Sequence, residues 1–109
     1  MKKPESRAEP RIPHARRGTL TVAGASIPCL IQDISSRGFL LMCTRQFSVG
    51  DILELRSELY PEKILQCKIE IRHISDDTLG TLIVEISDSA LKLCRQFIDE
   101  QYSERLKFG

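Results

Sequence analysis

The sequence predicts a small all-β barrel of six antiparallel strands, preceded by a basic arm and completed by one C-terminal α-helix. From Gly18 onward, short runs of apolar and β-branched residues alternate with turn residues, which is typical of compact all-β units. After Ser87 the apolar residues instead recur every three or four positions, as they do on one face of a helix. A chain of 109 residues holds one such domain. We expect a closed barrel because closure removes the exposed edges of the sheet.

Turn residues mark the borders of the expected strands. Gly24 separates the first two strands, Gly50 precedes the fourth, and Pro61 ends the fourth. The six expected strands cover residues 19–23, 26–34, 38–44, 52–58, 64–74 and 79–86. The fifth strand alternates most regularly, and one of its faces holds Leu65, Cys67, Ile69, Ile71 and His73. We therefore expect His73 to be a satisfied residue of the barrel.

The chain divides into an arm and a barrel domain. Residues 1–17 contain three prolines among charged residues, which predicts an extended, flexible arm that ends near Arg17. Residues 18–109 form the domain, with the barrel over about 18–87 and the helix over about 88–105. Ser87 or Ser89 can cap this helix, whose apolar face holds Leu91, Cys94, Phe97, Ile98 and Tyr102. The helix covers an open face or mouth of the barrel, or it pairs with a second copy, so a monomer and a homodimer both agree with the sequence.

Charge is divided between the two segments. The whole chain has a formal net charge of only +1, so an anion-binding site has to be local. Residues 1–17 hold six basic and two acidic side chains, a net charge of +4, whereas the remaining ten basic and thirteen acidic side chains give the body −3. Such an asymmetry indicates a basic arm for an anionic partner, or a solubilising tail.

Several classes of function are not expected for this chain. A metal site is not expected because no C-x-x-C pair occurs, and the four cysteines read as small core residues of a reducing, cytoplasmic protein: Cys29, Cys43, Cys67 and Cys94. No apolar segment reaches the roughly 18 residues of a membrane span, so we expect no membrane insertion. His14 and His73 are the only histidines, and no catalytic or phosphate-loop motif is present. The sequence therefore predicts a protein that is not an enzyme and needs no cofactor.

Two clusters of polar residues can carry binding chemistry. Arg7 and Arg11 lie four positions apart in the arm, where their guanidinium groups can grip phosphates and stack on a purine ring. Asp33 and Ser35 follow the second strand, and a carboxylate with a nearby hydroxyl can hydrogen-bond the edge of a guanine. Gly38 permits an unusual backbone angle or a close approach there. The alternatives are solvated tail charges and an ordinary polar turn.

Together the two clusters resemble the PilZ domain family. An R-x-x-x-R arm is followed by D-x-S-x-x-G after the second strand, and 22 positions separate Arg11 from Asp33. The Val49-Gly50-Asp51 turn, the strand containing Gly80 and the closing helix fit the same pattern, so the resemblance covers nearly the whole chain. PilZ domains are six-stranded β-barrels that act as bacterial receptors for the second messenger cyclic di-GMP. The resemblance therefore implies a nucleotide-binding protein of second-messenger signalling.

The resemblance also implies roles for single residues. Arg7 and Arg11 would clamp the phosphates and stack on guanine, Asp33 and Ser35 would read guanine edges, and Gly38 would shape the turn. No motif assigns a function to three further arginines near these clusters, which could add positive field: Arg16, Arg17 and Arg37. Ligand binding would order the arm and so signal to an effector protein that the sequence does not identify.

Two other functions compete with this hypothesis. The first is a protein-interaction adaptor of the same fold that does not depend on nucleotide, which the intact motifs disfavour. The second is a nucleic-acid binder that uses the basic arm. The aromatic residues are scattered rather than gathered on one strand face, and the body is acidic, so we expect no nucleic acid partner.

Overall fold

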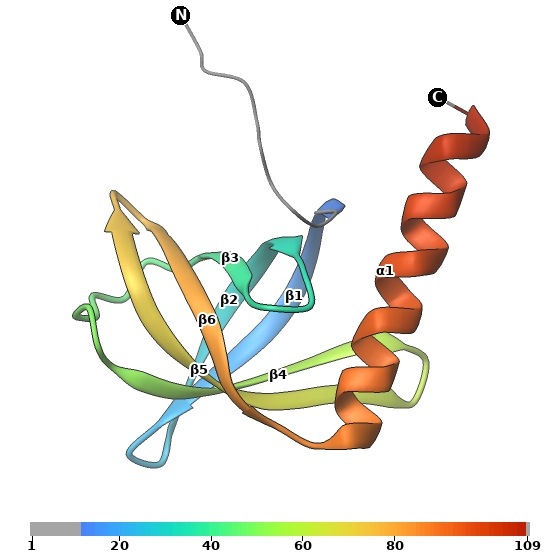
Figure 1. Ribbon diagram of the computed structural model, residues 1–109. Helices are drawn as coiled ribbons and strands as arrows, with labels where there is room; N and C mark the ends of the chain where they lie inside the picture. Colours follow the sequence, from blue (N-terminus) through green and yellow to red (C-terminus); the bar gives the residue numbers. More distant parts are fainter. Residues whose placement is uncertain (1–11, 109) are drawn as a thin grey trace, which may run out of the picture.

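The computed structural model describes the backbone of residues 12–108 and the side chains of residues 16–101 and 103. Six antiparallel strands form a closed barrel in the order β1-β2-β3-β6-β5-β4, and one helix follows the last strand (Figure 1). The elements are β1 (Ile12–Val22), β2 (Ala25–Ile34), β3 (Phe39–Met42), β4 (Ile52–Tyr60), β5 (Lys63–Ser75), β6 (Thr78–Ile86) and α1 (Asp88–Phe108). The predicted fold class is confirmed.

The first strand begins earlier than the sequence predicts. β1 starts at Ile12, so residues 12–17, which the sequence analysis assigns to the arm, belong to the barrel. Proline cannot donate a ladder hydrogen bond, but strands accept it at edges and bulges. Pro13 lies where β1 pairs with β2 alone, because the pairing with β4 covers only Thr19–Thr21, and the register with β2 shifts between Pro13 and Arg16. A bulge at an unpaired edge therefore accommodates the proline.

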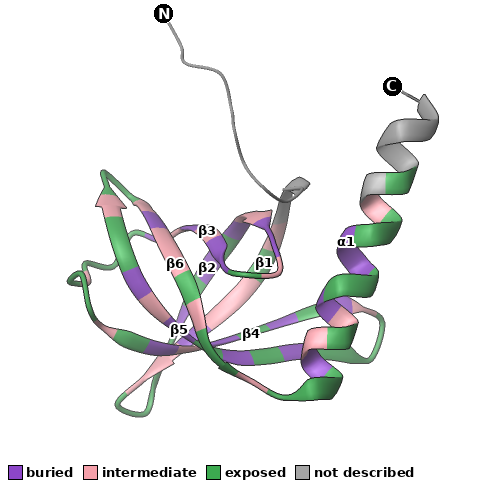
Figure 2. Ribbon diagram, in the orientation of Figure 1, coloured by how far each residue is buried: buried purple, intermediate pink, exposed green. Residues whose placement is uncertain are grey.

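The core lies inside the barrel and follows the expected alternation. Figure 2 shows buried and exposed residues alternating along the strands, and the inner face of β2 consists of Ile27, Cys29 and Ile31 as the pattern predicts. Fully buried leucines and isoleucines from five strands fill the interior: Leu20, Ile31, Leu41, Leu55 and Ile69. All four cysteines are free and buried, which confirms that they act as small core residues.

The alternation of β5 breaks at Arg72. Ile71 pairs with Thr81 but His73 pairs with Gly80, so β5 contains one extra residue at this point. Such a bulge moves the following side chains to the opposite face. Ile71 is buried, whereas Arg72 and His73 are both exposed. The expectation that His73 belongs to the inner face with Ile71 is therefore wrong, because strict alternation does not survive the bulge.

Helix α1 packs against one end of the barrel. The Ser87 hydroxyl accepts a hydrogen bond from the Ala90 N–H at 3.1 Å, so Ser87 is the cap. Four residues of the first half are buried in the common core, namely Ala90, Cys94, Phe97 and Ile98, while the predicted Leu91 is only half-buried. The second half extends beyond the barrel (Figure 1). In the described part of the chain, no helix is apolar over the length that a bilayer crossing requires.

Candidate functional site

The hydroxyl of Ser35 holds together the short loop between β2 and β3. It accepts hydrogen bonds from the N–H groups of Arg37 at 3.2 Å and Gly38 at 3.1 Å. It also lies 3.1 Å from the Gly38 carbonyl oxygen, to which it can donate, and the Ser35 N–H donates to the same oxygen at 3.0 Å. Ser35 is only 3% exposed. Its hydroxyl therefore fixes the shape of the loop from inside.

The far side of this loop is pressed against strand β6. A Cβ at Gly38 would overlap the carbonyl oxygen of Thr81 and lie 2.9 Å from the carbonyl carbon of Thr81. The Ile83 N–H donates to the Arg37 carbonyl at 2.7 Å, which ties the loop to the same strand. Gly38 does not have a positive φ. The expected close approach at Gly38 is thus an approach to the β6 backbone.

Thr81 is a structural partner of the loop that the sequence analysis did not single out. Its hydroxyl donates to the Phe39 carbonyl at 2.9 Å and accepts from the Phe39 N–H at 3.2 Å. These bonds connect the first residue of β3 to β6. Thr81 interrupts the largely apolar run from Leu79 to Val84, and this is the signal that could have indicated its role.

Asp33 lies on the outer side of the barrel, one residue before this loop. Its neighbour Ile34 is buried and pairs with buried Phe39, whereas Asp33 is half-buried and pairs with half-buried Leu40. Asp33 also pairs with Pro13 of β1. The register of β2 against β3 shifts between Ile31 and Asp33, so a bulge is present directly beside Asp33. Bulges of this kind re-aim side chains near functional sites.

The two arm arginines predicted to bind phosphate precede the first described strand. Arg7 and Arg11 lie outside the described residues, but Arg11 directly precedes Ile12, which pairs with Ile34 beside the loop. The chain therefore enters the described barrel next to the Asp33 loop.

The three auxiliary arginines lie in different surroundings. Arg37 is exposed on the loop, and Arg17 is exposed on β1. The Arg16 guanidinium carbon lies 4.7 Å from the centre of the Phe97 ring, so Arg16 contacts helix α1. Its Nε atom is buried and has no hydrogen-bond partner among the residues that the structure describes. The structure therefore leaves Arg37 and Arg17 accessible to an anion and engages Arg16 with the helix.

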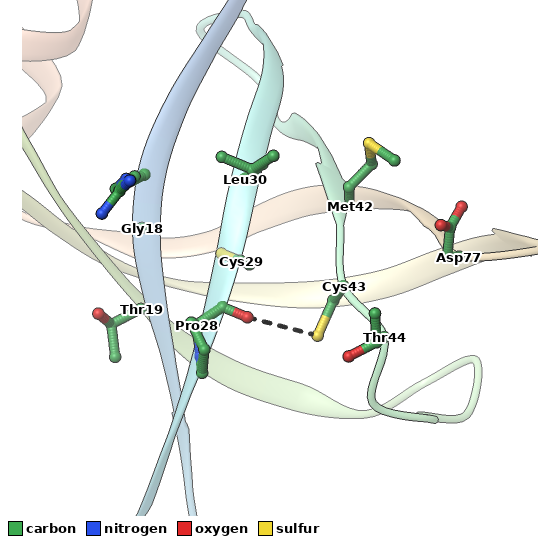
Figure 3. A pocket seen from close by; sticks show the side chains of 10 residues that line it. Gly18, Thr19, Pro28, Cys29, Leu30, Met42, Cys43, Thr44 and Asp77 are labelled. Carbon is green, nitrogen blue, oxygen red and sulfur yellow. Dashed lines mark hydrogen bonds between the residues drawn. The ribbon is translucent and has the colours of Figure 1, made fainter.

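A hollow of about 490 Å³ opens on β1, β2 and β3 (Figure 3). It lies where β2 and β3 separate, because their pairing ends at Leu30 and Met42, and the Cys43 thiol lies 3.8 Å from the Pro28 carbonyl oxygen. Its charged lining residues are one cation and one anion, Arg17 and Asp77, and Asp33 does not line it. The predicted site is therefore the open outer surface at Asp33 and not this hollow.

Titratable groups in the described residues are perturbed mainly by burial. Burial raises the pKa of the Cys29 and Cys67 thiols to about 12 and that of Cys94 to about 11. Burial and a 2.6 Å hydrogen bond from its hydroxyl to Glu100 raise the pKa of Tyr60 to about 12, and the same bond lowers the pKa of Glu100. The three thiols lie in the core, and the Tyr60–Glu100 hydrogen bond joins β4 to the surface of α1. The Cys94 thiol lies 3.8 Å from the Ser35 carbonyl oxygen, so it contacts the loop after β2 from inside the protein. The part of the chain that is described contains no cluster of three or more His, Cys, Asp or Glu side chains suited to a metal ion.

Three solved structures resemble this barrel. The inhibitor of motility MotI/DgrA of Bacillus subtilis superposes with a TM-score of 0.76 at 19% identity, covering 94% of this chain and 54% of that chain. The PilZ domain of Escherichia coli YcgR, with c-di-GMP, gives a TM-score of 0.75 at 12% identity, covering 94% and 96%. The PlzA protein of Borreliella burgdorferi, in complex with c-di-GMP, gives 0.66 at 19% identity, covering 85% and 41%. These likenesses show the fold, and this chain spans about half the length of MotI/DgrA.

Sequence comparison identifies the family. No curated protein matches the chain by sequence. The family model of the PilZ domain matches residues 5–100, which include the arm motif, the loop after β2 and most of α1. Because this match spans most of the 109 residues and the barrel agrees with it, the chain belongs to the PilZ domain family.

Proposed function

We propose that this protein is a non-enzymatic receptor for cyclic di-GMP. The observation that supports the proposal most strongly is the position of Asp33 on the outer side of a PilZ barrel, where β2 pairs with both β1 and β3. Its carboxylate lies on the outer surface, next to the point where the strand that follows Arg11 enters the barrel. Two of the similar solved structures contain c-di-GMP.

In this proposal some motif residues contact the ligand and the others hold the loop in place. Asp33 accepts hydrogen bonds from the N–H groups on the edge of one guanine. Arg7 and Arg11 clamp the phosphates and stack on a base, because a guanidinium is planar and presents several donors. Ser35 and Gly38 act on the loop, since the hydroxyl is buried among loop partners and the glycine is packed on β6. The role expected for Ser35 thus changes from reading guanine to presenting Asp33.

The output of the receptor is proposed to be a change at the N-terminal arm. Fixing the arm over the ligand costs roughly 1–2 kcal/mol per residue in backbone entropy, so the charge-assisted contacts of Arg7 and Arg11 have to offset it. Arg17 and Arg37 are exposed and add positive field around the site. Arg16 contacts Phe97 instead and does not contact the ligand in this proposal. The new surface is read by an effector protein.

Calorimetric titration with cyclic di-GMP tests this function. We expect saturable binding to the full chain, with GTP and cyclic di-AMP as control ligands. Arg7→Ala, Arg11→Ala and Asp33→Ala should each weaken binding at least tenfold, since a hydrogen bond to a charged group contributes about 1.5–3 kcal/mol. Arg95→Ala and Asp99→Ala are matched controls, because they remove the same charges from exposed positions on α1.

The outcomes separate a receptor from an adaptor. Binding that depends on Asp33 and the two arm arginines, but not on Arg95 or Asp99, supports the receptor. No binding by the folded protein contradicts it and leaves the nucleotide-independent adaptor of the same fold. Binding that survives all three site substitutions contradicts the proposed site.

A further inference from the structure

Cys29 and Cys43 lie opposite each other on neighbouring strands. The last pair in the register of β2 against β3 is Leu30 with Met42. The next position therefore places Cys29 across from Cys43. Both cysteines are buried, whereas Leu30 is exposed and Met42 is half-buried, so the two thiols lie on the same inner face. Figure 3 shows both cysteines at the hollow on β1, β2 and β3.

The backbone groups of the two cysteines face away from each other. The Cys43 N–H donates at 2.9 Å to the carbonyl of Asp77, in the turn between β5 and β6. The Pro28 carbonyl lies 3.8 Å from the Cys43 thiol and so faces β3, and since backbone groups alternate along a strand, those of Cys29 face β1. Opposite residues of this kind have Cα atoms about 4.5 Å apart in an antiparallel sheet, and a disulfide needs a spacing of roughly 4.4–6.8 Å. The register therefore predicts the Cα spacing that a disulfide requires.

The hollow gives a small molecule a route to both thiols. It has a volume of about 490 Å³, and Cys29 and Cys43 are among its lining residues. A water molecule occupies about 30 Å³ in the liquid, so a molecule as small as hydrogen peroxide fits easily. Cys67 and Cys94 form a second pair of nearby thiols, in which burial and then the Cys94 thiol raise the pKa of Cys67. Neither of them lines the hollow, so they serve as an internal control pair.

We propose that Cys29 and Cys43 form a reversible disulfide when the protein meets a peroxide. In the first step the Cys43 sulfur attacks one peroxide oxygen, the O–O bond breaks, an S–O bond forms, and the other oxygen leaves with the thiol proton as water. In the second step the Cys29 sulfur attacks the Cys43 sulfur, an S–S bond forms, the S–O bond breaks, and the hydroxyl leaves with the Cys29 proton as a second water. The two thiols lose two electrons, and the peroxide gains them.

The order of the steps follows from the surroundings of Cys29. Burial and then the nearby Cys43 raise the pKa of Cys29 to about 12, so Cys29 keeps its proton near neutral pH and reacts second. The bond would join the two strands that flank the Ser35 loop, and it would close residues 29–43 into a ring. Because a closed ring restricts the unfolded chain, the oxidised protein should be more stable than the reduced one. This inference does not depend on cyclic di-GMP.

Peptide mapping of the full chain after treatment with hydrogen peroxide tests the proposal. Trypsin places each cysteine in its own peptide, with Cys29 in residues 18–37 and Cys43 in residues 38–45. The folded protein is oxidised, its remaining thiols are blocked with N-ethylmaleimide under denaturing conditions, and the digest is compared with and without dithiothreitol. We expect peptides 18–37 and 38–45 to be linked until dithiothreitol separates them, and the other two thiols to be blocked.

Two variants and one stability measurement complete the experiment. Cys67→Ala removes a buried thiol outside the pair and should still give the linked peptides, whereas Cys43→Ala should leave the peptide with Cys29 unlinked. Oxidation should raise the Tm of wild type by at least about 5 °C, and dithiothreitol should reverse the rise.

The map of wild type decides the proposal even where a variant fails to fold. A link between Cys29 and Cys43 within one chain, together with the reversible rise in Tm, supports it. A link that contains Cys67 or Cys94, a link between two chains, or four thiols that are all still blocked after oxidation overturns it. A Tm that rises when dithiothreitol breaks the link also overturns it, because the bond would then strain the folded barrel.

Discussion

Two residues of the D-x-S-x-x-G motif act on the protein's own backbone. The Ser35 hydroxyl accepts hydrogen bonds from two N–H groups of the loop, and the missing side chain of Gly38 lets the loop lie directly on β6. Both are buried, so neither offers a surface to solvent. Asp33 is the residue of the three that lies on the outer surface. At the residue scale, the motif therefore consists of one surface carboxylate, which we propose binds the ligand, and two residues that fix the adjacent loop.

Gly38→Ala should destabilise the barrel by about 1–3 kcal/mol, because the added Cβ overlaps the Thr81 carbonyl and forces the backbone to shift. The midpoint of urea denaturation measures the effect. Gly80→Ala is the comparison, since its Cβ meets only ordinary contacts and should leave stability unchanged or slightly higher. Equal effects of the two substitutions would contradict the close approach at Gly38.

Ser35→Ala should lower the free energy of unfolding by about 1–3 kcal/mol, because it removes the acceptor of the buried Gly38 N–H and of the partly buried Arg37 N–H. It should also weaken cyclic di-GMP binding indirectly, through a less ordered loop. Ser35→Thr, which keeps the hydroxyl, should retain more stability than Ser35→Ala in the same denaturation experiment. If Ser35→Ala is as stable as wild type, the hydroxyl does not fix the loop.

Helix α1 is held to the barrel by an aromatic contact with a cation beside it. Phe97 is fully buried and meets Tyr60 edge-on, with ring centroids 5.7 Å apart. Arg16 lies over the same ring. Arg16 also lies on β1, three residues after Pro13, which pairs with Asp33. At the element scale, one short stretch of β1 thus connects the proposed ligand site with the helix.

Phe97→Ala should cost about 3–5 kcal/mol, because it empties a fully buried position between helix and barrel. Limited proteolysis should then cut α1 before the barrel unfolds, since the helix loses its main anchor. Gln96→Ala, at an exposed neighbouring position, is the control and should resist protease like wild type. A Phe97→Ala helix that stays protected would show that other contacts anchor α1.

The whole molecule depends on one core that barrel and helix share, and this core contains the four thiols. A thiol with a raised pKa stays protonated in the folded state at a pH where the unfolded chain already ionises. Folding stability from such a group is complete below its ordinary pKa of 9.0 and is lost as pH rises toward 12. Tyr60 acts in the same direction, between its ordinary 10.0 and about 12.

The free energy of unfolding should therefore fall steadily above pH 9, which urea denaturation at pH 7.5, 9.0 and 10.5 can measure. The Cys67→Ala variant starts less stable because it leaves a cavity, but its stability should fall less steeply with pH than that of wild type. A slope that is the same in wild type and Cys67→Ala would contradict the raised pKa of this thiol.

A bound ligand should stabilise the whole barrel. At a concentration of one hundred times Kd, linkage predicts about 2.7 kcal/mol, which corresponds to a rise in Tm of roughly 10–20 °C for a domain of this size. Cyclic di-GMP should raise Tm in wild type and Asp99→Ala but not in Asp33→Ala. A Tm that does not respond in wild type would argue against the receptor.

The sequence predicts most of the fold because its patterns are local. Alternation in β2 and the helical period after Ser87 locate these elements to within a few residues. The start of β1 and the face of the sheet on which His73 lies are not predictable in the same way, because both depend on bulges that arise from pairing with other strands. For the candidate site, the motif predicts that Asp33 binds the ligand, and this stays a prediction. The buried position of Ser35 and the packing of Gly38 on β6 follow only from tertiary structure.

Burial of the cysteines also determines how fast thiol-reactive chemicals modify the protein. Thiolates are the reactive form of cysteine, and here the sulfurs are covered while three of them hold their protons tightly. Cys29 and Cys43 line the hollow on β1, β2 and β3, whereas oxidants and alkylating agents can reach Cys67 and Cys94 only when the barrel opens. The rate at which a labelling reagent modifies Cys67 and Cys94 therefore reports the opening of this barrel, without any added probe. In a cell under oxidative stress, damage to these two residues would be governed by how often the barrel unfolds.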